Sequence, residues 1–108
     1  MTVKELASAL DCKIACMPDE SREITGGYAG DLLSWVMGRA SSGDAWVTIM
    51  SNINIVAVAS LADTACIILS EGVIPDDGVV EKATEVGVNI LMSQLDTYAL
   101  CASIFKLI

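Results

Sequence analysis

Apolar runs and segments with helical spacing take turns along this chain. Short continuous apolar runs are typical of strands covered on both faces, and longer segments with apolar residues three or four apart are typical of helices. The pattern predicts strands at 13–17, from about 23 into a glycine loop at 26–30, and at 45–50, 65–69 and 88–92. Helices are predicted near the N-terminus and at 31–39, 55–62, 76–86 and 96–108.

Several of these boundaries carry a chemical signal. Thr2 and Glu5 have the spacing of a capping box at the first helix. Asp31 and Asp96 stand where carboxylates cap helix N-termini, and Gly87 stands where a helix ends. The direction of the first strand stays open.

The order of these elements predicts the fold class. Strands joined by helices imply right-handed crossovers and a mainly parallel sheet with helices packed on it. We therefore expect an α/β fold, a three-layer α/β/α arrangement with a mainly parallel sheet of about five strands. No linker, repeat or low-complexity segment interrupts the chain, so residues 1–108 are expected to form one domain.

The apolar content exceeds what a small core needs. Of 108 residues, 54% are hydrophobic, and the segment 54–62 is apolar on almost every side. Part of this surface is expected to be buried against another subunit, most simply in a homodimer. The interface residues expected are Trp35, Met37, Ile55, Val56, Val58 and Ala59.

Charge and cysteine usage narrow the partners and the compartment. Six basic residues against 14 acidic ones give a formal net charge of −8, which disfavours nucleic acid and anionic membranes as partners. No apolar run is long enough to span a bilayer, and no signal peptide is evident. The four cysteines lie among apolar neighbours and are expected to be reduced, buried thiols in a cytoplasmic protein.

Several segments resemble a known family in their order and spacing. They are Tyr28–Ser34, Gly43–Ile49, Asn54–Ala59, Ile67–Leu69, Pro75–Asp77 and Asp96–Tyr98. Together they resemble the DRTGG-domain family, whose members occur alone or beside CBS domains and phosphotransacetylases. The resemblance implies a fold similar to the non-catalytic N-terminal domain of HPr kinase/phosphorylase. It also implies an accessory or regulatory module that often dimerises. The chain departs from the family's name motif, since Ser51–Asn52 and Ser70–Gly72 stand in its place and only Gly72 matches.

A polar crevice is predicted where the strands end. Glycines at 26–30 let a backbone approach a ligand, and polar residues after later strands would meet at the carboxyl edge of the sheet. The candidate ligand-binding residues are Gly26, Gly27, Tyr28, Gly30, Asp31, Asn52, Asn54, Ser70 and Glu71. The alternative is that these residues, and Asp96 with Thr97, only form caps and turns.

No catalytic arrangement stands out. The chain has no phosphate-binding P-loop and no histidine, which excludes Ser-His and Cys-His nucleophile pairs. No spacing argument joins Asp31, Asp44 and Glu71 as acid–base partners or magnesium ligands, and no metal or cofactor is expected. The leading hypothesis is a non-catalytic regulatory or protein-interaction domain. The alternative is a sensor that binds a nucleotide or phosphometabolite at the 26–31 crevice.

Overall fold

Five helices and five strands alternate along the chain in the computed structural model, which describes residues 1–108. In chain order they are α1 (Val3–Ala9), β1 (Lys13–Cys16), β2 (Gly26–Ala29), α2 (Leu33–Arg39), β3 (Asp44–Thr48), α3 (Asn54–Ala62), β4 (Cys66–Leu69), α4 (Val79–Val86), β5 (Ile90–Met92) and α5 (Thr97–Leu107).

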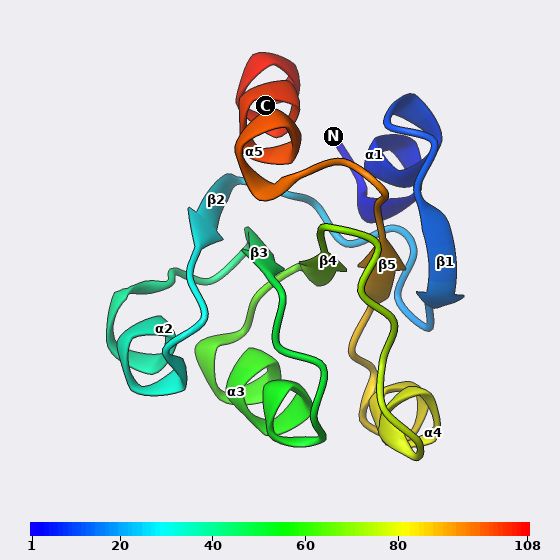
Figure 1. The fold of residues 1–108 in the computed structure, drawn as a ribbon, viewed down its shortest axis with the longest axis vertical. Helices are drawn as coiled ribbons and strands as arrows, with labels where there is room; N and C mark the ends of the chain where they lie inside the picture. The colour runs from blue at the N-terminus through cyan, green and yellow to red at the C-terminus, as the bar shows by residue number, and fades with distance from the viewer.

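The strands form one sheet in the order β1-β5-β4-β3-β2. All neighbours pair in parallel except β1, which runs antiparallel to β5. Helices α1 and α5 lie on one face of the sheet, and α2, α3 and α4 lie on the other (Figure 1). The predicted α/β fold with three layers and a mainly parallel sheet is confirmed, and the first strand is antiparallel.

Each face of the sheet carries its own hydrophobic core, because successive strand residues point to opposite sides. Trp46 and Ile67 pack beneath α2, α3 and α4, whereas Val47 and Ile68 pack beneath α1 and α5. All four are almost fully buried. Burial on both faces explains why the central strands are continuous apolar runs.

The caps predicted for the first and last helices are confirmed. Thr2 accepts a hydrogen bond from the Glu5 amide, and the Glu5 carboxylate accepts one from the Thr2 amide. Asp96 accepts a hydrogen bond from the amide of Ala99 at 2.8 Å. Gly87 ends α4 with a left-handed φ of 82°, a conformation that glycine adopts without strain.

The predicted cap at Asp31 is wrong. Helix α2 begins two residues later, at Leu33, and no side chain caps it. The Asp31 carboxylate instead accepts hydrogen bonds from the Thr48 hydroxyl and the Ile49 amide, so it joins the end of β3 to the chain after β2. The fourth helix also begins later than predicted, at Val79 after Gly78.

The contact surface predicted on the third helix is wrong as well. Four residues of α3 expected at a subunit interface are buried against the sheet of their own chain, namely Ile55, Val56, Val58 and Ala59. The outward side of α3 carries Asn54, Ala57, Ser60 and Leu61. The outward side is therefore part polar and part apolar, while the four residues expected at an interface fill the core beneath the helix.

The remaining expectations concern thiols and membranes. All four cysteines are free; Cys66 is buried, and Cys12, Cys16 and Cys101 are half-buried rather than fully enclosed. None of the five helices combines the length and the apolar character that crossing a bilayer requires.

The two faces of the sheet are covered unequally. Three helices lie on one face and two on the other (Figure 1). Helix α5 packs over β2 and β3, yet Gly27 and Ala29 of β2 remain exposed, which leaves a strip of the sheet uncovered at this edge.

Candidate functional site

A groove of about 490 Å³ runs between β2 and α5. Its floor is made of small side chains and backbone from β2 and β3: Gly26, Gly27, Ala29, Ala45 and Val47. Its wall comes from α5: Cys101, Ile104, Phe105 and Ile108. Thr25 and Tyr28 complete the lining. No side chain in the groove carries a formal charge, although acidic residues outnumber basic ones across the chain.

The floor of the groove follows from the sheet register. Gly27 pairs with Ala45 and Ala29 pairs with Val47. Register neighbours in a parallel sheet point to the same face, so Gly27 and Ala29 lie on the side of α5. They are exposed, whereas Ala45 and Val47 are buried beneath that helix.

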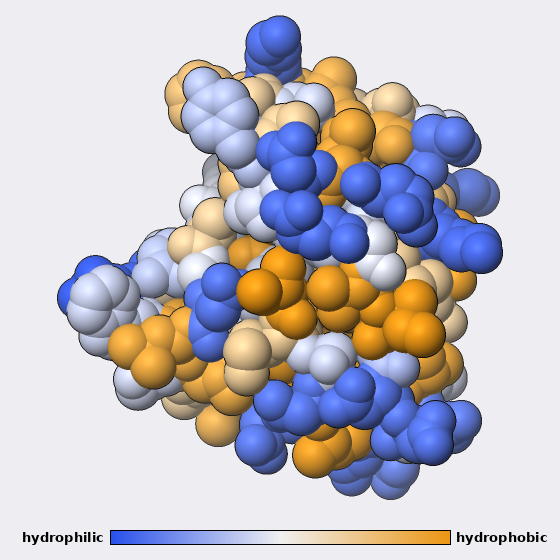
Figure 2. All heavy atoms as spheres, in the orientation of Figure 1, coloured by the Kyte–Doolittle hydropathy of each residue, from blue (hydrophilic) through white to orange (hydrophobic).

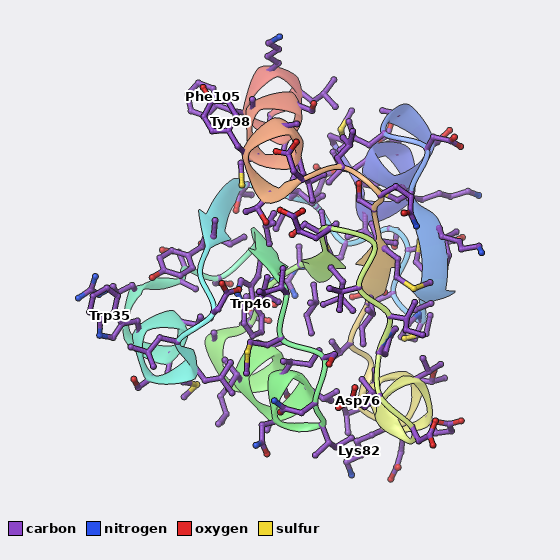
Figure 3. The ribbon with its side chains drawn as sticks, viewed as in Figure 1. Trp35, Trp46, Asp76, Lys82, Tyr98 and Phe105 are labelled. Atoms are coloured by element: carbon purple, nitrogen blue, oxygen red, sulfur yellow. The ribbon has the colours of Figure 1, made fainter.

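A ridge of aromatic side chains rises beside the groove. Tyr98 is 86% exposed and Phe105 is 84% exposed, and the two residues stand two helical turns apart on α5. Both rings project to the same side of α5, away from the core that holds Trp46 (Figure 3). In Figure 2 the outline of the molecule is indented below these rings, between α5 and α2. A concave apolar strip and a convex aromatic ridge therefore lie side by side.

Strand β2 is also an open edge of the sheet. An edge strand leaves a row of backbone N–H and C=O groups unpaired, and proteins usually protect such edges with charged residues, proline or bulges. The sequence of β2, Gly-Gly-Tyr-Ala, contains none of these residues. This edge is thus well suited to contact another polypeptide.

Part of the predicted crevice does line this groove. Gly26, Gly27 and Tyr28 belong to it, but they lie within strand β2 and not in a loop before a helix. A side chain at Gly26 would come within 2.7 Å of the Asp44 carboxylate, which explains the glycine there. Gly30 follows the strand, and its carbonyl accepts a hydrogen bond from the Trp46 indole at 2.9 Å.

The other predicted crevice residues are engaged in local hydrogen bonds. The Asn52 side chain accepts from the Asn54 amide at the start of α3, and Asp31 bonds to the end of β3. Ser70 is fully buried, and its hydroxyl lies 2.6 Å from that of Thr97. Glu71 accepts from the Thr97 amide at 2.9 Å. These residues act as caps and ties, the alternative that the sequence left open, and they do not converge with Gly26 and Gly27 on one cavity.

The charged residues are dispersed and largely paired. Asp44 accepts a hydrogen bond from the Ser41 amide. No group of three or more cysteine or acidic side chains is arranged to hold a metal ion. Three of the basic side chains form ion pairs, Lys4 with Glu20, Arg22 with Asp63 and Lys82 with Glu85, and Arg39 lies 3.7 Å from the ring of Trp35. Trp35 and Met37 remain about half exposed.

The sequence matches the family model of the DRTGG domain over residues 5–107. The chain belongs to the DRTGG domain family. No curated protein matches it. The structure is similar to a crystal structure of the CBS and DRTGG domains from the regulatory region of a Clostridium perfringens pyrophosphatase, complexed with the activator diadenosine tetraphosphate.

This structural likeness shows that the two proteins share the DRTGG fold. The TM-score is 0.75 at 12% sequence identity, and the match covers 94% of this chain. It covers 44% of the other chain, so this DRTGG domain spans less than half of the regulatory region in that structure.

Sequence reasoning missed two features of this DRTGG domain. One is Asn89, which is 2% exposed. Its side-chain oxygen accepts a hydrogen bond from the Asp19 amide, and its side-chain nitrogen donates to the carbonyls of Asp19 and Ala65. The ridge on α5 was missed too, although its spacing was visible. Residues 98, 101, 105 and 108 repeat at helical intervals beside the core positions Leu100 and Ile104, so the apolar face of α5 is wider than its core contact. A helix whose apolar face extends beyond its core contact indicates a second contact.

Proposed function

We propose that this DRTGG domain is a non-catalytic regulatory module that acts by associating with a second copy of itself through the groove between β2 and α5. The observation that carries the proposal is the groove without charged side chains beside the exposed rings of Tyr98 and Phe105. Catalysis is not part of the proposal, because Asp31, Asp44 and Glu71 are each held in local hydrogen bonds.

The shape of the surface favours a second copy as the occupant. A two-fold interface uses the same patch on both subunits, so the patch must be complementary to itself. Here the ridge of one protomer can enter the groove of its partner, while the partner's ridge enters the first groove. The small floor at Gly27 and Ala29 leaves room for an aromatic ring.

The charge and the area of this surface also favour a second copy as the occupant. Two copies with a net charge of −8 repel each other, and this repulsion is smaller where the side chains of the contact surface carry no charge. Buried aromatic side chains cover about 150–250 Å² each, so Tyr98 and Phe105 together offer roughly 300 Å² per protomer. A standard interface needs about 800 Å² per partner. The groove lining and the edge of β2 are the surfaces available for the remainder.

Sedimentation equilibrium with one variant and a matched control tests the proposal. Phe105→Gln removes an exposed ring from the ridge, and Leu61→Gln removes an exposed apolar side chain from α3 on the opposite layer, where it is 73% exposed. Burial of a Phe side chain is worth about 2 kcal/mol. Two such rings per dimer predict a dissociation constant raised about a thousandfold for Phe105→Gln.

The unaltered chain should be dimeric at micromolar concentration, and the control should dimerise as the unaltered chain does. A chain that stays monomeric at about 100 μM, where weak specific complexes still form, would overturn the proposal. Equal weakening by both variants would show that the groove is not the interface.

A nucleotide sensor is the second candidate, favoured by the activator bound in the pyrophosphatase regulatory region. Binding of a polyphosphate draws on several cations, but only Lys13 and Lys106 are left without an ion pair or a ring contact. Diadenosine tetraphosphate should therefore bind this chain poorly. Titration calorimetry checks this, and tight binding would move the sensor to first place.

A further inference from the structure

A second cavity lies where the chain changes sides of the sheet. After β4 the chain runs to α4, on the face that also carries α2 and α3; after β5 it runs to α5, on the opposite face (Figure 1). In open α/β sheets, connections that leave adjacent strands toward opposite faces open a crevice at the carboxyl ends, and ligands bind there.

Such a crevice is present in this chain, and three segments form its walls. It encloses about 590 Å³, within the range of small-molecule sites. Gly72–Ile74 after β4 form one wall, and Ser93–Leu95 after β5 form the second. Residues 10–12 and Lys13, the first residue of β1, form the third. It shares no lining residue with the groove between β2 and α5.

The walls are fixed by backbone hydrogen bonds. The Glu71 amide donates to the Leu95 carbonyl at 2.8 Å, and the Gly72 amide donates to the Ser93 carbonyl at 3.0 Å. Gly72 has a φ of 74°, and a side chain there would come within 2.9 Å of the Gln94 amide oxygen. A glycine at position 72 therefore lets the Gln94 side chain lie over the wall.

Three polar side chains of the crevice have no partner within the chain, whereas the Ser93 hydroxyl accepts a hydrogen bond from the Leu95 amide. The side chains of Gln94, Lys13 and Asp11 make no hydrogen bond or ion pair among those of the structure. Apolar surface surrounds them, provided by Leu10, Val73, Ile74, Met92 and Leu95. The site thus combines an amide, one cation, one carboxylate and an apolar lining.

We propose that this crevice binds a nucleobase-like heterocycle, carried by a nucleoside or a nucleoside monophosphate. The Gln94 amide both donates and accepts, which matches the paired donor and acceptor on the edge of such a ring. Val73 and Met92 supply apolar and thioether contacts to its faces. Lys13 can meet one phosphate group, and Asp11 beside it disfavours a longer phosphate chain.

Amide chemical-shift titrations with adenosine, AMP, ATP and uridine test this site. Gln94→Leu keeps the side-chain size and removes both hydrogen-bonding groups of the chain's only glutamine. Phe105→Gln is the control, since it alters the groove and leaves the crevice intact. We expect saturable shifts at 72–74 and 92–95 with at least one nucleoside or AMP. Affinity should fall about tenfold or more in Gln94→Leu and stay unchanged in Phe105→Gln.

Three results would overturn the proposal. One is no shift with any of the four compounds at about 5 mM, a concentration that reveals even very weak ligands. Another is equal binding by Gln94→Leu. The third is ATP binding much more tightly than AMP, which would assign the site to phosphates. The oligomeric state of the same samples is measured separately, so failure of this site is distinguishable from failure of the dimer.

Discussion

Adding a methyl group at Gly27 separates the stability of the protomer from association through the groove. Gly27 lies in strand β2, and a Cβ atom there would meet only the Ala45 carbonyl oxygen, at 3.6 Å. That is an ordinary van der Waals distance, so Gly27→Ala fits the single chain. Replacing glycine by alanine in a strand should stabilise the protomer by about 0.5–1 kcal/mol.

The same methyl group enters the floor of the groove. Extra atoms in a packed contact cost about 1–3 kcal/mol, and a two-fold dimer contains two such sites. We therefore expect the free energy of dimerisation to weaken by about 2 kcal/mol or more, which raises the dissociation constant roughly thirtyfold. Gly38→Ala is the matched control, because nothing lies within 4 Å of a Cβ atom at that position in α2.

Urea unfolding at low protein concentration measures the stability of the protomer, and sedimentation equilibrium measures dimerisation. Gly38→Ala should stabilise the protomer by up to about 1 kcal/mol and leave dimerisation unchanged. If Gly27→Ala stabilised the protomer and dimerised as tightly as the unaltered chain, the floor of the groove would not be part of the interface, and the reasoning would be refuted.

Three further predictions concern the protomer. Asn89→Ala should lower the free energy of unfolding by about 2–4 kcal/mol in urea titrations, because the backbone groups of Asp19 and Ala65 lose their buried partner; a change under 0.5 kcal/mol would contradict this. Asp31→Ala should cost only about 1 kcal/mol, since its bonds to Thr48 and Ile49 are partly exposed, and a loss as large as that of Asn89→Ala would contradict this. Burial raises the pKa of the Cys66 thiol from 9.0 to about 12. The folded state therefore favours the neutral thiol, and stability present below pH 9 is lost as the pH rises toward 12. Unfolding curves in this range should fall less steeply for Cys66→Ala, and identical slopes would argue against the burial effect.

Much of the fold could be predicted because its signals are local. Apolar runs mark strands that are buried on both faces, and Thr2, Asp96 and Gly87 mark helix ends through bonds or backbone angles within a few residues. The error at Asp31 has a different origin. Its partner Thr48 is 17 residues away, and a carboxylate in a loop bonds to whatever amide and hydroxyl the fold brings near.

The candidate site was harder to predict, because it depends on coverage of the sheet. The apolar content predicts a contact surface on α3, but α3 is the middle helix of its layer, and Ile55, Val56, Val58 and Ala59 are buried beneath it. The two most exposed large apolar side chains, Tyr98 and Phe105, lie on α5, whose layer has only two helices. Which helix ends up beside an uncovered strip depends on strand order and on the face each crossover takes. Neither was available from spacing alone.

The position of the crevice was equally hard to predict from the sequence. Ser70 and Glu71 were placed correctly after β4, yet their side chains bond to Thr97 at the start of α5. The cavity opens one residue further on, at Gly72, against Gln94. The rule that ligands bind at the carboxyl ends of parallel strands indicates this edge of the sheet. The position of the cavity along the edge depends on the turn of the chain after β5 toward α5.

Alkylation of Cys101 as a function of protein concentration tests the central claim most directly. Cys101 lines the groove and is half-buried, while the half-buried Cys12 and Cys16 lie outside it. Peptide mass spectrometry reads each thiol separately. Association through the groove should slow alkylation of Cys101 by about tenfold or more as dimers form, because a packed interface excludes reagent, and should leave Cys12 and Cys16 unchanged. An alkylation rate at Cys101 that stays constant while the protein dimerises would contradict the account.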